Sequence, residues 1–112
     1  MDALYDGTLA QCEQTKIRPM AWSAQGGGKI YGDSESAVRI RKVCDQIRHQ
    51  YSDASDDALV TAWVMNHPSR PVVITGSNQL ARIESQAKAA GLALERQDWY
   101  ALWSAATGKA VP

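Results

Sequence analysis

The feature that most constrains this chain is a short apolar strand that runs directly into a helix. Val72 to Ile74 are three consecutive β-branched residues, which is the composition of a buried strand. Gly76 and Ser77 predict a turn, and residues 78–90 have the spacing of a helix. The sequence therefore predicts the order strand, turn, helix.

A helix that begins just after a buried strand presents free N–H groups and the positive end of its dipole beyond the strand. An anion, above all a phosphate, is the natural ligand there. Gly76 allows close approach of the backbone to a ligand, and the hydroxyl of Ser77 is suited either to cap the helix or to donate to a phosphate oxygen. The alternative interpretation is an ordinary strand-to-helix connection with a serine cap and a solvated polar face.

Two stripes of side chains are predicted along this helix. Polar residues recur every four positions and begin at the anion site: Asn78, Arg82 and Gln86. Apolar residues form the other stripe: Leu80, Ile83, Ala87 and Ala90. Gly91 is expected to end the helix in the left-handed conformation.

Length and composition narrow the function classes. A chain of 112 residues is one domain at most, and its twelve basic and twelve acidic residues give no global attraction to nucleic acid or to an anionic membrane. Cys12 and Cys44 lack metal or redox spacing, so we expect buried free thiols in a reducing compartment. No apolar run is as long as the roughly 18 residues of a membrane span, and a cytoplasmic location is expected.

The first part of the chain predicts a helix at residues 7–16 and a brief buried strand at residues 17–23. Residues 24–33 contain four glycines, which favour a mobile loop, and their spacing matches no phosphate-binding fingerprint. Residues 34–51 then predict a long helix whose charged residues form a solvated face. Its apolar stripe is Ala37, Ile40, Cys44, Ile47 and Tyr51.

Two further helices are predicted. The acidic segment 53–57 suits the start of a helix that runs to His67, for which a cap role is favoured over a ligand role. Residues 96–107 predict the last helix, which presents Trp99 and Trp103 on one side and ends at Gly108.

The two strands are separated by a helical crossover, so they are expected to be parallel and connected with right-handed topology. This is α/β layering. An all-parallel sheet needs several strands and cover on both faces, whereas only two strands are visible, so we expect the chain to be incomplete.

Segments along essentially the whole chain resemble the C-terminal part of an aldo-keto reductase, with most similarity to the bacterial predicted oxidoreductases of that family. The segments are Asp6–Leu9, Arg18–Ser23, Gly26–Gly28, Ala62–Val64, Val73–Ser77, Arg82–Ile83 and Gly108–Pro112. The resemblance implies that residues 1–112 are a single segment of a TIM (β/α)8 barrel, namely its last two strands with their helices. It also implies NADP(H) as cofactor and carbonyl reduction by hydride transfer.

The resemblance assigns roles to individual residues. It places Trp22 against the nicotinamide, Ser23 at the pyrophosphate, and Arg82 on the adenine and the 2′-phosphate. The glycine-rich segment matches a flexible loop that folds over the bound cofactor. Together with the anion-site argument, the predicted cofactor-binding residues are Trp22, Ser23, Gly76, Ser77, Asn78, Arg82 and Gln86.

The chain departs from the family pattern in three ways. A lysine is frequent in the family where this chain has Gly76, so preference for NADP(H) rests mainly on Arg82 and the helix geometry. Glu95 stands where relatives commonly have a threonine cap. The family's catalytic Asp, Tyr, Lys and His belong to earlier strands, so no catalytic residue and no metal site are predicted, and we expect an inactive fragment.

Two alternatives remain open on the sequence. One is a non-catalytic nucleotide-binding or phosphate-binding module that uses Ser77 and Arg82. The other is an assembly piece, because open strand edges and an uncovered Trp99 and Trp103 face invite self-association or pairing with the missing barrel strands. Neither nucleic acid nor a membrane is an expected partner.

Overall fold

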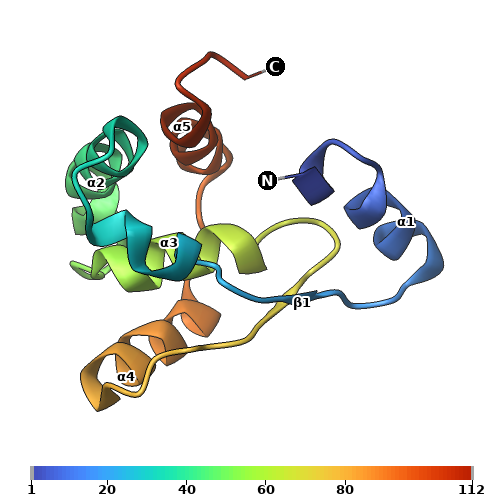
Figure 1. Ribbon diagram of the computed structural model, residues 1–112, viewed down its shortest axis with the longest axis horizontal. Coiled ribbons are helices and arrows are strands. Elements are labelled where there is room, and N and C mark those ends of the chain that lie inside the picture. The colour runs from blue at the N-terminus through green and yellow to red at the C-terminus, as the bar shows by residue number, and fades with distance from the viewer. Residues whose placement is uncertain (1, 112) are drawn as a thin grey trace.

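The computed structural model describes residues 2–111 and has five α-helices and two short strands within them (Figure 1). The elements are α1 (Thr8–Thr15), β1 (Met20–Ala21), α2 (Glu35–Ile47), α3 (Asp56–Met65), β2 (Val72–Val73), α4 (Leu80–Lys88) and α5 (Arg96–Thr107). Short 3-10 helices cover Asp2–Leu4, Gly26–Tyr31, Arg48–Tyr51 and Ala89–Gly91. The predicted order of helices and strands is confirmed.

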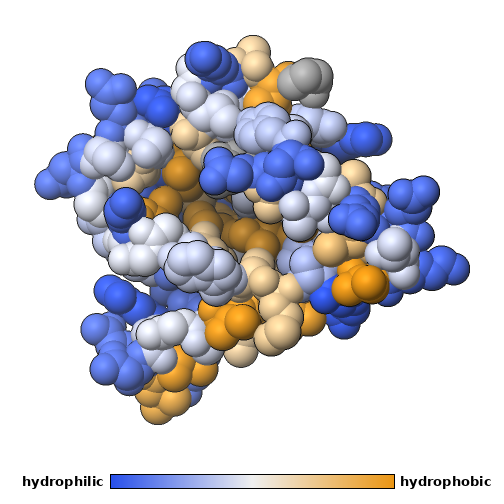
Figure 2. Space-filling view, turned by 45° about the vertical axis from the view of Figure 1, so that its right-hand side comes forward, coloured by the Kyte–Doolittle hydropathy of each residue, from blue (hydrophilic) through white to orange (hydrophobic). Residues whose placement is uncertain are grey.

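β1 and β2 form a parallel two-stranded sheet, as predicted, with Met20 opposite Val72. The N–H of Val72 donates to the carbonyl of Pro19 at 2.8 Å, and that of Ile74 donates to Ala21 at 2.9 Å. The prediction that both strands are buried is wrong, because Met20 is 68% and Ile74 45% exposed. Two strands are too few to make a sheet covered on both faces, and hydrophobic side chains lie exposed on one face of the molecule (Figure 2).

The core lies between α2, α3 and α5. Its fully buried side chains include Cys44 and Leu59, which pack with Ile47, Tyr51 and Leu102. The predicted stripe on the long helix is confirmed, and burial raises the pKa of the Cys44 thiol to about 12. Cys12 is also a free thiol, but it is only half-buried.

A buried hydrogen-bond network fixes the start of α5. The hydroxyl of Tyr51 donates to the carboxylate of Asp98 at 2.6 Å and accepts from the N–H of Glu95 at 2.8 Å. Glu95 provides no side-chain cap. The hydroxyl of Tyr51 therefore provides an acceptor for the backbone N–H of the residue that precedes the first turn of α5.

Aromatic residues join α3 to α5. The rings of Trp63 and Trp99 stack with centroids 5.2 Å apart, and each indole N–H donates to the other residue's carbonyl at 2.9 and 2.8 Å. Trp103 donates its indole N–H to the hydroxyl of Tyr5 at 3.0 Å. Trp99 and Trp103 are both half-buried, so the face that was expected to be uncovered is covered in part, by Trp63 and by Tyr5.

The arginines of α2 are not simply a solvated face. Arg39 donates to the carbonyl of Ala105 at 2.9 Å, which ties α2 to α5. Arg48 donates to Asp45 at 2.5 Å and to Asp56 at 2.7 Å, and it also donates to the carbonyl of Ala54. Arg48 lies in the 3-10 turn that follows α2, and its pair with Asp45 is local to the helix. Helical periodicity does not predict the contacts with Ala105, Ala54 and Asp56, because these acceptors lie outside α2.

α4 differs from its prediction at both ends and in its orientation. It begins at Leu80, two residues later than expected, and it tightens into a 3-10 turn in which Gly91 lacks the left-handed conformation. Leu80 is 69% exposed, whereas Arg82 and Gln86 are half-buried. Arg82 and Gln86 thus face the body of the molecule, whereas Asn78 is exposed and lies before the helix, so the alternative interpretation of a solvated polar face holds only for Asn78.

The remaining helix ends agree better with expectation. α5 ends at Gly108, as predicted, and the φ of Gly108 is 73°, which is the left-handed conformation. His67 accepts the N–H of Ser69 at 3.1 Å, so it closes the turn after α3. No helix within residues 2–111 combines the length and apolar character that crossing a bilayer requires.

Replacement of Tyr51 by Phe tests the buried network. The change leaves the Asp98 carboxylate, which is 6% exposed, without its hydroxyl donor. We expect the free energy of unfolding to fall by about 1 to 3 kcal/mol, measured by urea denaturation. The matched control is Tyr100→Phe, because the hydroxyl of Tyr100 makes no hydrogen bond within the described residues and its ring stacks on Trp103. Equal stability of the two variants would contradict the network's role.

Candidate functional site

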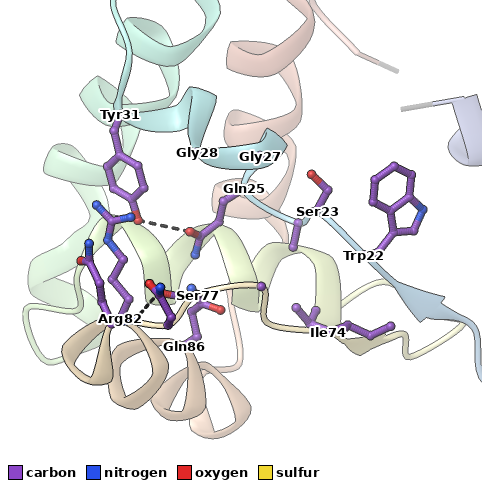
Figure 3. A pocket seen from close by; sticks show the side chains of 15 residues that line it. Trp22, Ser23, Gln25, Gly27, Gly28, Tyr31, Ile74, Ser77, Arg82 and Gln86 are labelled. Atoms are coloured by element: carbon purple, nitrogen blue, oxygen red, sulfur yellow. Dashed lines mark hydrogen bonds between the residues drawn. The ribbon is translucent and has the colours of Figure 1, made fainter.

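A cleft of about 500 Å³ lies where the carboxyl ends of β1 and β2 meet (Figure 3). Ligands of parallel α/β sheets bind at this edge. All seven residues predicted from the sequence line the cleft: Trp22, Ser23, Gly76, Ser77, Asn78, Arg82 and Gln86. The structure therefore brings together residues that come from two segments far apart in the chain.

Ser77 does not cap α4. The hydroxyl of Ser77 accepts the N–H of Gln79 at 3.1 Å, and Gln79 is itself the residue that precedes the helix. The N–H of Ser77 faces the hydroxyl of Thr75 at a long distance of 3.4 Å. The O–H of Ser77 thus remains available as a donor, and the first-turn N–H groups of Leu80 and Ala81 have no acceptor within residues 2–111.

Arg82 is the cation of the cleft. Its guanidinium is half-buried and has no ion-pair partner within residues 2–111, in contrast to Arg39 and Arg48. It lies with its Cζ atom 4.5 Å from the ring centroid of Tyr31, which is a cation–π contact. Its positive charge is therefore available to an anion that enters the cleft.

The glycine-rich segment forms one wall of the cleft. Gly26, Gly27 and Gly28 have φ values of 61°, 65° and 86°, a conformation that other residues adopt only with strain. The segment is not irregular throughout, because 3-10 turns span Gly26–Tyr31 and Ile30 is buried. Arg41 donates to the carbonyl of Gly32 at 2.8 Å and also to that of Ile30, which fastens the segment to α2.

Both ends of this segment are also tied to α3. The hydroxyl of Tyr31 donates to the carboxylate of Asp57, and Gln25 Oε1 lies 3.2 Å from the same hydroxyl. Gln25 Nε2 is 3.4 Å from the carbonyl of Asp57 and from the hydroxyl of Thr61. Partial burial and the bond to Asp57 raise the pKa of Tyr31 well above its usual range.

Sequence reasoning missed Gln25, Tyr31 and Asp57. Tyr31 lies three residues after the glycine run, and an aromatic residue so close to a glycine-rich segment was the available signal. Asp57 was assigned only to the start of α3, where it does lie. Its contact with Tyr31 joins residues that are 26 positions apart, which no local pattern reveals.

The remaining predicted residues occupy distinct parts of the cleft. Figure 3 shows Trp22 and Arg82 at opposite ends, with Ser23 and Ser77 between them. Trp22 is 81% exposed and Ser23 has a φ of 56°. Within the part of the chain that the structure describes, no cluster of three His, Cys, Asp or Glu residues is arranged to hold a metal ion.

Comparison with known proteins gives relatives that are oxidoreductases. The chain is 37% identical over 109 residues to the oxidoreductase YdhF of Escherichia coli, a match that covers 97% of this chain and 36% of that protein. It is 36% identical over 115 residues to a 6-dehydroglucose reductase of Agrobacterium fabrum, and this match covers 98% of this chain and 36% of that protein. The uncharacterized oxidoreductase YcsN of Bacillus subtilis is 30% identical over 113 residues, a match that covers 100% of this chain and 38% of that protein.

The chain thus spans little more than a third of the length of the curated relatives that it matches. No protein-family model matches it. The similarity is to a part of oxidoreductases and runs along nearly the whole of this chain.

The raised pKa of Tyr31 predicts a pH dependence of stability. The folded state favours the neutral phenol of Tyr31. The stability that this phenol contributes to the folded state is therefore complete below the unfolded pKa of about 10 and is lost as the pH rises above that value. Denaturation midpoints measured from about pH 8 to about pH 11 should fall less steeply for Tyr31→Phe than for the parent chain. Tyr100→Phe is the control. A parallel decline for the parent chain and Tyr31→Phe would contradict the assignment.

Proposed function

We propose that this chain is the C-terminal part of an NADP(H)-dependent aldo-keto reductase and holds part of its cofactor site. The observation that carries the proposal is the convergence of all seven predicted residues on one cleft at the carboxyl ends of two parallel strands. Active sites of (β/α)8 barrels lie at this end of the strands, and β1 and β2 would be the last two strands of such a barrel. The similarity to oxidoreductases supports the same conclusion.

The groups that line the cleft fit a phosphorylated dinucleotide. The proposed 2′-phosphate site consists of Gly76, the O–H of Ser77 and the guanidinium of Arg82, which lacks a carboxylate partner within residues 2–111. A charged donor of this kind binds phosphate through directional N–H groups as well as charge. A Cβ atom built on Gly76 meets no atom within 4 Å, so a ligand has open access to this backbone.

The other cofactor groups are assigned along the cleft. Adenine is placed against Arg82 and Gln86, the pyrophosphate near Ser23 and the glycine-rich segment, and the nicotinamide toward Trp22. The order follows the arrangement in Figure 3, where Trp22 and Arg82 mark the two ends. NADP(H), when bound, supplies the hydride that reduces a carbonyl.

The tyrosines of this chain are not proposed as proton donors to a carbonyl. Tyr31 donates its hydroxyl proton to Asp57, and Tyr51 donates its own to Asp98. Tyr5 accepts from the indole N–H of Trp103, and neither residue lines the cleft. We therefore assign cofactor-binding residues to this chain and no catalytic residue.

Isothermal titration with NADP⁺ and with adenosine 2′,5′-bisphosphate tests the cofactor site. Arg82→Gln should weaken binding of both ligands by roughly 10- to 100-fold, since a hydrogen-bonded charge contributes about 1.5 to 3 kcal/mol. Arg96→Gln removes the same charge from an exposed position at the start of α5 and should leave the affinity unchanged. A folded parent chain that binds neither ligand would refute the proposed function.

A second measurement tests the absence of a catalytic group. The 112-residue chain, mixed with NADPH and an activated aromatic aldehyde, should give no loss of NADPH absorbance above the protein-free rate. The expectation holds because bound nicotinamide without a proton donor does not reduce a carbonyl at a useful rate. Robust turnover that Arg82→Gln abolishes would show that the chain carries its own catalytic acid.

A further inference from the structure

The ring of Tyr31 contacts Arg82, the cation at one end of the cleft, and the hydroxyl of Tyr31 is hydrogen-bonded to α3. Its ring faces the guanidinium of Arg82 at 4.5 Å, and its hydroxyl donates to the carboxylate of Asp57. Figure 3 shows the ring of Tyr31 directly beside the end of the Arg82 side chain, with its hydroxyl directed toward Gln25. The ring therefore connects the glycine-rich segment, α3 and α4.

The position of the Tyr31 ring is strongly constrained. Asp57 is 8% exposed, and within residues 2–111 its carboxylate accepts a hydrogen bond from Tyr31 alone. Moving the ring out of place leaves a buried carboxylate without a donor, which is unfavourable. Ile30 and the carbonyl of Gly32 are held independently, by burial and by Arg41. Tyr31 is therefore held against α3 through its own hydroxyl, in addition to the separate contacts of Ile30 and Gly32.

We infer that Tyr31 is a positioning residue that holds the guanidinium of Arg82 over the cleft for an anionic ligand. The inference rests on the proposed function and goes beyond it, because it identifies what orders the arginine. A long arginine side chain loses rotamer freedom when it binds, and an aromatic ring that already orders it reduces this loss. One face of the guanidinium is taken by Tyr31, which leaves its N–H edge and its other face for the ligand.

The opposite interpretation makes a different prediction. If the ring of Tyr31 occupied the place of the ligand and had to leave, its removal would strengthen binding. If it holds Arg82 in place, its removal weakens binding. The sign of the change in affinity therefore decides between the two.

Isothermal titration of the full chain with adenosine 2′,5′-bisphosphate provides this test. Tyr31→Leu removes the ring and should weaken binding by about 3- to 30-fold, the range of a cation–π contact. Tyr31→Phe keeps the ring and should recover most of that loss. Unchanged or tighter binding by Tyr31→Leu would overturn the inference, with circular dichroism used to confirm that each variant is folded.

A double-mutant cycle separates positioning from a general structural role. If Tyr31 acts through Arg82, Tyr31→Leu should have almost no further effect in the Arg82→Gln background. If it only supports the fold, the two losses should add. Additive losses would therefore count against positioning even if both single variants bind weakly.

A ligand-free measurement distinguishes failure of this inference from failure of the proposed function. In proton NMR, the Nε–H of Arg82 should be shifted upfield by the ring of Tyr31 in the parent chain and in Tyr31→Phe, and not in Tyr31→Leu. No binding by the parent chain refutes the proposed function whether or not this shift is seen. Absence of the shift in the parent chain refutes the positioning of Arg82 by Tyr31, even if the nucleotide binds.

Discussion

The cleft depends on parallel pairing between two very short strands. The hydrogen bonds from Val72 to Pro19 and from Ile74 to Ala21 align the carboxyl ends of β1 and β2. Parallel strands require a long crossover, and here α2 and α3 supply it together with most of the core. A sheet of this size is marginal by itself, so the packed helices of the crossover maintain the alignment that the cleft needs.

α3 connects the core to the cleft. Leu59 and Ala62 are completely buried in the packed interior, and Trp63 stacks on Trp99 of α5. The other side of the same helix presents Asp57 and Thr61 to the glycine-rich segment. α3 also meets α4 through the hydroxyls of Ser55 and Ser85. One helix thus contacts both walls of the cleft, one through Asp57 and Thr61 and the other through Ser55.

Charge is distributed unevenly in a chain that has no net charge. Arg39, Arg41 and Arg48 are engaged by carbonyls or carboxylates of other elements. Arg82 is held by an aromatic face instead, which orders its side chain without neutralising it. A local positive charge inside a polar cleft is therefore compatible with neutrality overall.

The sequence by itself determined the order of the elements, the parallel pairing, the buried stripe of α2, the bounds of α5 and its end at Gly108. The elements and their ends follow from side-chain periodicity and from the conformational freedom of glycine, which are local properties. The parallel pairing follows from the helical crossover between the two strands. Only the tertiary structure decided that α4 turns Arg82 inward and Leu80 outward, and that Tyr31 reaches Asp57. The reason is that periodicity defines the faces of a helix but not which face finds a partner, and partners come from distant parts of the chain.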